Sequence, residues 1–297
     1  MCGRYVIARA AGDLMADVDA APGEPFQGED LDELRANWNV APTTEVPIVL
    51  ERLDDGQVLR ELHVARWGLV PSWAKEISVG ARMFNARSET AAEKPSFRAA
   101  VKKRRCAIPA NGYYEWRKRL GPDGKPAKGT KDAPAKQPYF IHPPSESENI
   151  WFAGLYEWWQ DPQGHWILSC SILTAESPDP DSDDETLAEL AAIHDRIPVA
   201  MDREALDAWL DPSAEDKDGA QALIERGDLT EDETATLASR LAALELQLTP
   251  AERAELDAVA GQPVKAIVRS PLLRCQNTVA PLAAALGLEP RVDDRLT

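Results

Sequence analysis

The sequence is poor in the residues that build metal and disulfide sites. Its 297 residues include four cysteines and four histidines, with no CxxC motif and no Cys/His pair at ligand spacing. We therefore expect no zinc site and no other cofactor. The chain also lacks a run of about 20 apolar residues, and Met1–Tyr5 begins no apolar leader. We expect a cytoplasmic protein that contacts no membrane, with its cysteines reduced.

Glycine is scarcer than proline, with 17 residues against 23. This excess of proline predicts many rigid turns, which argues against a helical bundle or a coiled coil. Apolar runs of strand length follow one another through the first 174 residues, and Asp54–Gly56 is a hairpin turn between two of them. We predict an α+β fold whose curled antiparallel sheet, or open barrel-like β core, has peripheral helices. The predicted strands are Tyr5–Ala8, Val46–Leu50, Val58–Val64, Cys106–Ala110, Gly112–Trp116, Trp151–Trp159 and Trp166–Thr174. Helical patterns cover Leu31–Asn37, Ser96–Lys103 and Asp202–Leu210.

The expected core spans residues 2–211 and is interrupted twice. Residues 120–137 are rich in glycine, proline and lysine and predict a flexible basic loop. Asp179–Glu189 is an acidic insertion. Residues 212–297 predict an acidic, largely helical extension that packs on the core. We expect the chain to be a monomer.

Positive charge is scarce overall but concentrated in one segment. The net charge is -17, yet residues 81–140 hold fifteen Lys/Arg against five Asp/Glu, a local charge of +10. The remaining residues carry -27. Such asymmetry lets one face attract phosphate while the rest keeps the protein soluble. Alternatively, Lys102–Arg105 and Lys118–Lys136 are only a solvated helix end and loop, and charge alone does not decide between the two.

Cys2 carries the clearest chemical signal. Its small side chain favours removal of the initiator methionine, which leaves an amine and a thiol on adjacent carbons. The ordinary pKa values, near 7.7–8 for the amine and about 8.5 for the thiol, make both nucleophilic at neutral pH. The thiol could attack an amide with the amine as base, or the amine could condense with an aldehyde before the thiol closes a thiazolidine ring. A buried structural cysteine is the alternative.

Few side chains could serve Cys2 as acid or base. His194 precedes a rigid Ile197–Pro198 step and is placed to project into a cleft. Glu115 lies in an aromatic strand, where a carboxylate must be paired or have a raised pKa. Glu157 lies in a similar Tyr-Glu-Trp pattern, and the residue types do not distinguish the two. Asn85 could be a turn or N-cap residue. Arginines that could hold a phosphate are Arg4, Arg82 and Arg87. Rings that could stack on bases are Trp67, Trp73 and Trp116.

Several motifs in a fixed order resemble the SOS response-associated peptidase family. The resemblance covers residues 2 to about 211. Its motifs are Met1–Tyr5, Asn39–Thr43, Arg66–Trp73, Phe84–Thr90, Arg105–Trp116, Phe152–Tyr156, Leu173–Thr174 and Ile193–Pro198. The Asp179–Glu189 insertion and the chain after Asp211 depart from the family pattern.

The resemblance implies a sensor of abasic sites in single-stranded DNA that shields the lesion during DNA repair or the SOS response. It would remove Met1 as a peptidase and crosslink itself, with lyase-like chemistry, through a Cys2 thiazolidine. The implied roles are Cys2 as nucleophile, Asn85 positioning the amine, Glu115 assisting its proton transfer, and His194 handling the proton on the sugar oxygen. The implied DNA contacts are Arg4 and Arg87 to phosphates, Trp67 and Trp116 near the bases, and Thr174 lining the site.

Two other functions fit parts of the sequence. An N-terminal-nucleophile amidohydrolase or amidotransferase would also begin Met-Cys-Gly, and Asn111–Gly112 is the one Asn-Gly pair available for its oxyanion site. A non-catalytic module would bind nucleic acid reversibly through residues 81–140 and leave Cys2 inert. Denaturation would release DNA from such a module, whereas a covalent crosslink would survive.

Overall fold

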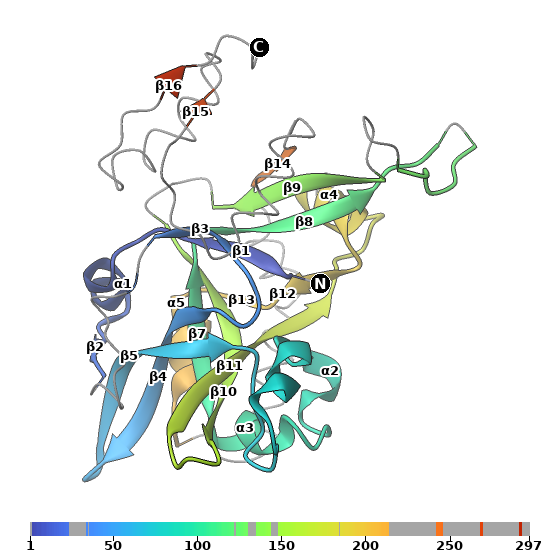
Figure 1. The fold of residues 1–297 in the computed structure, drawn as a ribbon. Helices are drawn as coiled ribbons and strands as arrows, with labels where there is room; N and C mark the ends of the chain where they lie inside the picture. The colour runs from blue at the N-terminus through green and yellow to red at the C-terminus, as the bar shows by residue number, and fades with distance from the viewer. Residues whose placement is uncertain are drawn as a thin grey trace. The chain divides into compact units, whose positions relative to one another are not determined.

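The computed structural model divides the chain into two units, Met1–Gln247 and Leu248–Thr297 (Figure 1). In the second unit, β15 (Val268–Arg269) and β16 (Arg291–Val292) form a two-stranded parallel sheet. The first unit carries every predicted site residue and is described below. The structure describes residues 2–23, 34, 36–121, 123–129, 135–143, 148–183, 185–213, 242–245, 268–269 and 291–292.

Five long strands form a closed barrel. Their order around the ring is β5, β4, β7, β10 and β11. Four of the five pairings are antiparallel, and the ring closes where β5 and β11 pair in parallel, with Trp67 opposite Cys170. The bounds are β4 Glu45–Asp54, β5 Gln57–Trp67, β7 Arg105–Ala110, β10 Ile150–Gln160 and β11 Trp166–Glu176. The predicted barrel-like α+β core is confirmed, and the Asp54–Gly56 turn joins β4 to β5.

A second sheet lies at one end of the barrel and contains the first strand of the chain, which follows Cys2 and Gly3. Its strand order is β14, β9, β8, β1 and β3. The bounds are β1 Arg4–Ile7, β3 Asn37–Val40, β8 Gly112–Lys118, β9 Lys136–His142 and β14 Ala242–Glu245. Short strands extend the barrel sheet: β2 Ala21–Pro22, β6 Asn85–Arg87, β12 Arg196–Pro198 and β13 Ala200–Met201.

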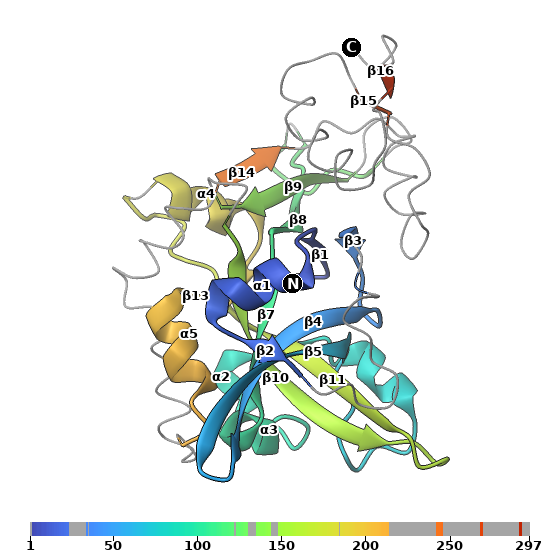
Figure 2. The ribbon, with the colours of Figure 1, turned by 90° about the vertical axis from the view of Figure 1, so that its left-hand side faces the viewer.

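The helices lie outside the strands (Figure 2). They are α1 Ala11–Val18, the 3-10 helix η2 Ile77–Arg82, α2 Ser88–Ala91, α3 Arg98–Lys103, α4 Glu185–Ile193 and α5 Arg203–Leu210. In α5 the Asp202 carboxylate caps the Ala205 N–H at 2.8 Å, while Leu206, Trp209 and Leu210 are buried. Within the described residues, no helix is long and apolar enough to cross a membrane.

The predicted helices at 96–103 and 202–210 correspond to α3 and α5. The one predicted at 31–37 lies mostly outside the described residues, and Asn37 begins β3. The helical pattern expected after residue 212 also lies mostly outside them. Within that stretch, Ala242–Glu245 forms β14 and pairs with β9.

Candidate functional site

Cys2 lies two residues before β1, a strand that Tyr5 anchors in the barrel. The Tyr5 ring is fully buried and makes edge-to-face contacts with Trp67 at 5.1 Å and Phe152 at 6.3 Å between ring centroids. β1 pairs with β8 so that Arg4 lies opposite Tyr114. If this antiparallel register continues, Gly3 lies opposite Glu115. The residues before β1 are thereby brought to the strand that carries the predicted acid-base carboxylate.

Asn85 reaches Cys2 from the other sheet. It begins β6, which pairs in parallel with β11, Asn85 lying opposite Ile172. A close backbone crossing precedes it: Gly68 has φ +135°, and a Cβ added at Gly80 would lie 2.3 Å from the Gly68 carbonyl oxygen. Glycine is required at both positions because a larger residue would push this segment, and Asn85 with it, away from β5.

Asn85 holds the backbone of Cys2 directly. Its side-chain Nδ2 donates to the Cys2 carbonyl oxygen at 2.7 Å. The other amide atom, Oδ1, is buried and has no hydrogen-bond partner among the described residues. A buried acceptor of this kind costs free energy until it receives a donor. Asn85 thus fixes the Cys2 peptide and keeps one acceptor available beside it.

The Cys2 thiol is buried and protonated at rest. Burial raises its pKa well above the ordinary value, the nearby Glu115 charge raises it further, and the positive amino terminus opposes both effects. Its Sγ lies 3.8 Å from the Arg4 carbonyl oxygen, which accepts the S–H. A thiol in this state needs a base or an electrophile formed beside it before it reacts.

Glu115 is the carboxylate whose charge acts on the Cys2 thiol. Its side chain projects from β8 into the interior and is 2% exposed. Burial raises its pKa, whereas the charges of the amino terminus and of His194 lower it. Glu157, on β10, instead forms an ion pair with Arg104, whose Nη2 lies 2.8 Å from a Glu157 carboxylate oxygen. Of the two Tyr-Glu-Trp patterns, the one with Glu115 therefore has the carboxylate whose charge acts on Cys2, and its role in proton transfer stays a prediction.

His194 is held by the residues that follow it. It comes directly after α4, and its Nδ1 accepts the Arg196 backbone N–H at 3.0 Å, which leaves the proton on Nε2 when the ring is neutral. Nδ1 also lies 2.8 Å from an Asp195 carboxylate oxygen, a contact that suits the protonated ring. Each protonation state of the imidazole thus has a partner at Nδ1.

Arg196 connects this segment to α2 and β11, a role that the sequence did not reveal. Its Nη2 lies 3.0 and 2.9 Å from the two Glu89 carboxylate oxygens, and it also donates to the Thr174 carbonyl. Its Nε donates to Thr174 Oγ1 at 3.3 Å. The guanidinium is nearly buried, so these contacts fix the His194 segment against α2 and against β11, the strand that pairs with β6 and its Asn85.

The predicted DNA-contacting residues differ in accessibility. Arg87 is exposed on β6, opposite the buried Thr174 on β11. Arg4 is half-buried, and its guanidinium donates to the Gly3 carbonyl at 2.8 Å. These residues lie on strands that also carry or adjoin Cys2, Asn85 and the His194 segment. Their contacts with DNA stay predictions.

The tryptophans separate into structural and accessible rings. Trp67 is 0% exposed, and its indole N–H donates to the Phe84 carbonyl at 2.8 Å, directly before Asn85. A base could stack on it only if the covering residues moved. Trp116 is half-buried on β8, whereas Trp73 is 61% exposed. Trp73 is therefore the ring most open to a nucleotide among the three.

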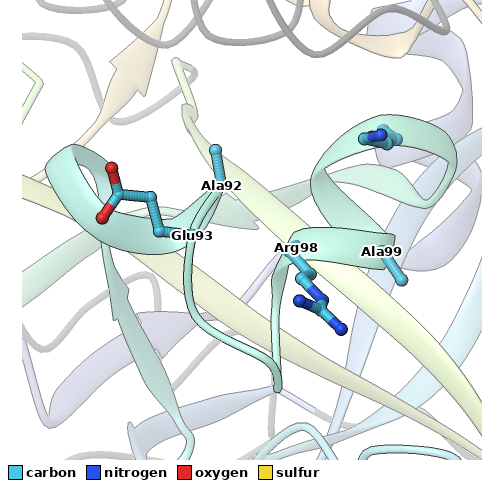
Figure 3. A pocket seen from close by; sticks show the side chains of 5 residues that line it. Ala92, Glu93, Arg98 and Ala99 are labelled. Carbon is cyan, nitrogen blue, oxygen red and sulfur yellow. The ribbon is translucent and has the colours of Figure 1, made fainter.

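A hollow with two basic and one acidic side chain in its walls lies between α2 and α3 (Figure 3). Its lining residues are Ala92, Glu93, Arg98, Ala99 and Lys102. None of them is a predicted site residue, so the reacting groups and this hollow are separate features. Among the described residues, no group of three potential metal ligands occurs.

Comparisons with known proteins identify the family. The model of the SOS response associated peptidase (SRAP) family matches residues 1–241. The chain belongs to this family. It is 35% identical over 240 residues to the abasic site processing protein YoqW of Bacillus subtilis (strain 168), which covers 80% of this chain and 93% of YoqW. It is 33% identical over 217 residues to the abasic site processing protein HMCES of Rattus norvegicus, covering 62% of this chain and 56% of that protein.

Solved structures show the same fold. A protein of Bacteroides thetaiotaomicron superposes with a TM-score of 0.61 at 23% identity, covering 84% of this chain and 96% of its own. A phage-related protein of Bordetella bronchiseptica gives 0.56 at 24% identity, covering 83% and 95%. Residues 242–297 are similar to a second family, the histidine phosphatase superfamily (branch 1).

Proposed function

We propose that this SRAP protein binds single-stranded DNA at abasic sites and crosslinks itself to them through Cys2 once Met1 has been removed. The relatives named abasic site processing proteins support the substrate. The observation that carries the mechanism is the Asn85 hydrogen bond to the Cys2 carbonyl, made beside a buried Glu115 whose charge acts on the Cys2 thiol. The protein acts as a soluble monomer in the cytoplasm, where the lesion would be shielded during repair.

The chemistry begins at the amine and ends at the thiol. The neutral Cys2 amine adds to the C1 aldehyde of the ring-opened sugar, and loss of water gives an imine. The Cys2 sulfur then adds to the imine carbon, its proton passes to the nitrogen, and a five-membered thiazolidine results. The balance is one water released per crosslink, with no oxidant or reductant. The order suits a thiol whose pKa is raised by burial, because the imine supplies a strong electrophile next to it.

The surrounding side chains divide the proton transfers. Glu115 accepts the proton that the amine must lose, and its raised pKa makes it a better base than an exposed carboxylate. His194 handles the proton on the sugar oxygen as the ring opens to the aldehyde. Asn85 holds the Cys2 backbone, and its open Oδ1 can receive an N–H of the amine. Removal of Met1 by the protein itself would use the same groups on an amide.

Contacts along β1 weigh against the amidotransferase alternative. Asn111, the asparagine of the Asn-Gly pair, accepts the Ala8 backbone N–H at 2.7 Å and donates to Asn149 at 3.2 Å. Ala8 is six residues from Cys2, or about 20 Å along an extended strand. Asn111 is therefore engaged at the far end of β1, where it could not support an oxyanion at Cys2.

The deciding experiment is the intact mass of the protein after mixing with single-stranded DNA that contains one abasic site. We expect a heat-stable species equal to the protein without Met1 plus the oligonucleotide, less one water. A variant that keeps a residue before Cys2, verified by mass, should form no adduct because its amine has become an amide. An adduct with that extended protein would overturn the aminothiol mechanism. Binding that denaturation releases completely would favour the non-catalytic module.

A further inference from the structure

The end of β8 and the loop that follows it form a basic arm, which we define as residues 117–129. Figure 1 shows this loop leaving the second sheet after β8. The arm has one acidic residue, Asp123, among those that the structure describes. Its bases are Arg117, Lys118, Arg119, Lys125 and Lys128.

Backbone hydrogen bonds connect the described residues of the arm, which include part of the flexible loop predicted at 120–137. The Arg119 N–H donates to the Ala135 carbonyl at 2.9 Å, and the Arg119 carbonyl accepts the Ala127 N–H at 2.8 Å. Arg119 thus lies between two neighbouring chain segments. A turn at Gly124, with φ +72°, reverses the chain so that Gly121 N–H donates to Lys125 O at 2.8 Å.

Most of the arm's charge is exposed to solvent. Arg117, Lys118, Lys125 and Lys128 are exposed, and in the described part of the chain no ion pair involves any of them. Other arginines of the described chain are ion-paired, for example Arg52 with Glu61 and Arg203 with Asp19. In a chain of net charge -17, like charges gathered without counter-ions make a local positive potential that favours a polyanion.

The arm begins on β8, the strand that carries Glu115. Side chains two apart on a strand share a face, so Arg117 lies on the face of Glu115. Gly121 is six residues farther along than Glu115, a distance of about 20 Å at the rise of an extended strand. Stacked nucleotides advance about 3.4 Å each along a strand, so this distance corresponds to roughly six nucleotides.

We propose that the arm is a second phosphate-binding surface, which holds the DNA backbone roughly six nucleotides from the abasic site. The proposal rests on the proposed function for its ligand. It predicts that the protein binds a long single strand more tightly than a short one, because only the long strand reaches the arm. An acidic segment of the chain itself is the competing occupant, and it would make the arm inhibitory to DNA binding.

The test measures reversible binding of the full chain to single strands with a central tetrahydrofuran abasic analogue, which has no aldehyde. A 7-mer reaches only the site, and a 21-mer also reaches the arm. For the double variant Lys125→Gln, Lys128→Gln we expect weaker 21-mer binding, with a log-log salt slope shallower by about 1.4 for two lost phosphate contacts. Binding of the 7-mer should change less than twofold. Asp123→Asn, which keeps the Oδ1 acceptor used by the Lys125 N–H, should tighten 21-mer binding.

The matched control is Arg52→Gln, Arg203→Gln, which removes the same charge from ion-paired positions and should leave the salt slope unchanged. Equal losses on the 7-mer and the 21-mer, or tighter 21-mer binding by the arm variant, would overturn the proposal. Crosslinking is scored separately with natural abasic 7-mer. If neither wild type nor variant forms an adduct, the proposed function fails, whereas a length effect would still support the arm.

Discussion

Asn85 and Cys2 are 83 residues apart in sequence and are joined by a hydrogen bond of 2.7 Å between side chain and backbone. The bond connects the two sheets, since Cys2 precedes β1 and Asn85 begins β6. It fixes the position of the peptide from which the reactive amine and thiol both project. Positioning of this kind lowers the entropy cost of a reaction between two partners.

Replacing Asn85 tests this positioning. Asn85→Ala removes the donor and leaves the Cys2 carbonyl unpaired, a loss of about 1–3 kcal/mol. We expect the rate of adduct formation at saturating abasic DNA to fall by about 5- to 150-fold. The matched control is Asn111→Ala at the far end of β1, which should affect unfolding but not the rate per folded molecule. Equal rates for both variants would remove Asn85 from the mechanism.

Glu115 and Glu157 offer a matched pair for testing proton transfer. Glu115→Gln should slow adduct formation by about 10- to 10,000-fold, the usual contribution of general acid-base catalysis. Glu157→Gln should leave the rate unchanged and change the free energy of unfolding by less than about 1 kcal/mol, because burial raises the pKa of Glu157 and so offsets the gain from its ion pair with Arg104. Single-turnover rates and urea unfolding measure the two effects. A larger rate loss in Glu157→Gln than in Glu115→Gln would mean that Glu157, and not Glu115, carries out the proton transfer.

Glu115 should also make stability depend on pH. Burial raises its pKa in the folded protein above the value in the unfolded chain, so the folded state binds the proton more tightly. The contribution of the protonated Glu115 to stability is fully present below the pKa of the unfolded chain, and it is lost as pH rises through the pKa of the folded protein. Glutamine does not ionise, so Glu115→Gln lacks this loss of stability at higher pH. Relative to wild type, we therefore expect the free energy of unfolding of the variant to rise from pH 4 to pH 7. Urea midpoints at the two values measure it, and a parallel pH dependence in both proteins would contradict the shifted pKa.

Local signals explain which parts of this fold were predictable. β10 and β11 are runs of apolar, β-branched and aromatic residues of strand length, and Asp55–Gly56 supplies the positive φ values that a tight hairpin needs. Helix α1 was missed because its eight residues have no side-chain cap and only two buried side chains. The closing β5–β11 pair was also missed, since a parallel pairing of distant segments leaves no mark within either strand.

The site was predictable as a set of residues and not as a geometry. Cys2 stands out through its place in the chain, and Asn85, Glu115 and His194 through their motifs. The Arg196 contact with Glu89 joins positions 107 residues apart, which residue types alone do not couple. The burial of Trp67 is equally non-local, because it depends on Tyr5 and Phe84 packing around the indole.

Trp67 and Trp73 should therefore respond differently to substitution. Trp73 is 61% exposed, and stacking of one base on an aromatic ring is worth about 1–3 kcal/mol. Trp73→Ala should weaken reversible binding of single-stranded abasic DNA by about 5- to 150-fold and leave the unfolding midpoint unchanged. Fluorescence anisotropy and thermal unfolding of the same preparations measure both.

Trp67→Phe provides the opposite case. The substitution leaves a cavity beside Tyr5 and removes the hydrogen bond to the Phe84 carbonyl, which together cost about 2–4 kcal/mol of unfolding free energy. Because that carbonyl directly precedes Asn85, the variant should also crosslink more slowly, while the affinity of its folded fraction for DNA changes less than in Trp73→Ala. If Trp67→Phe instead lost affinity without losing stability, the ring would be reaching the bases, and the strands that bury it in this structure would have to open when DNA binds.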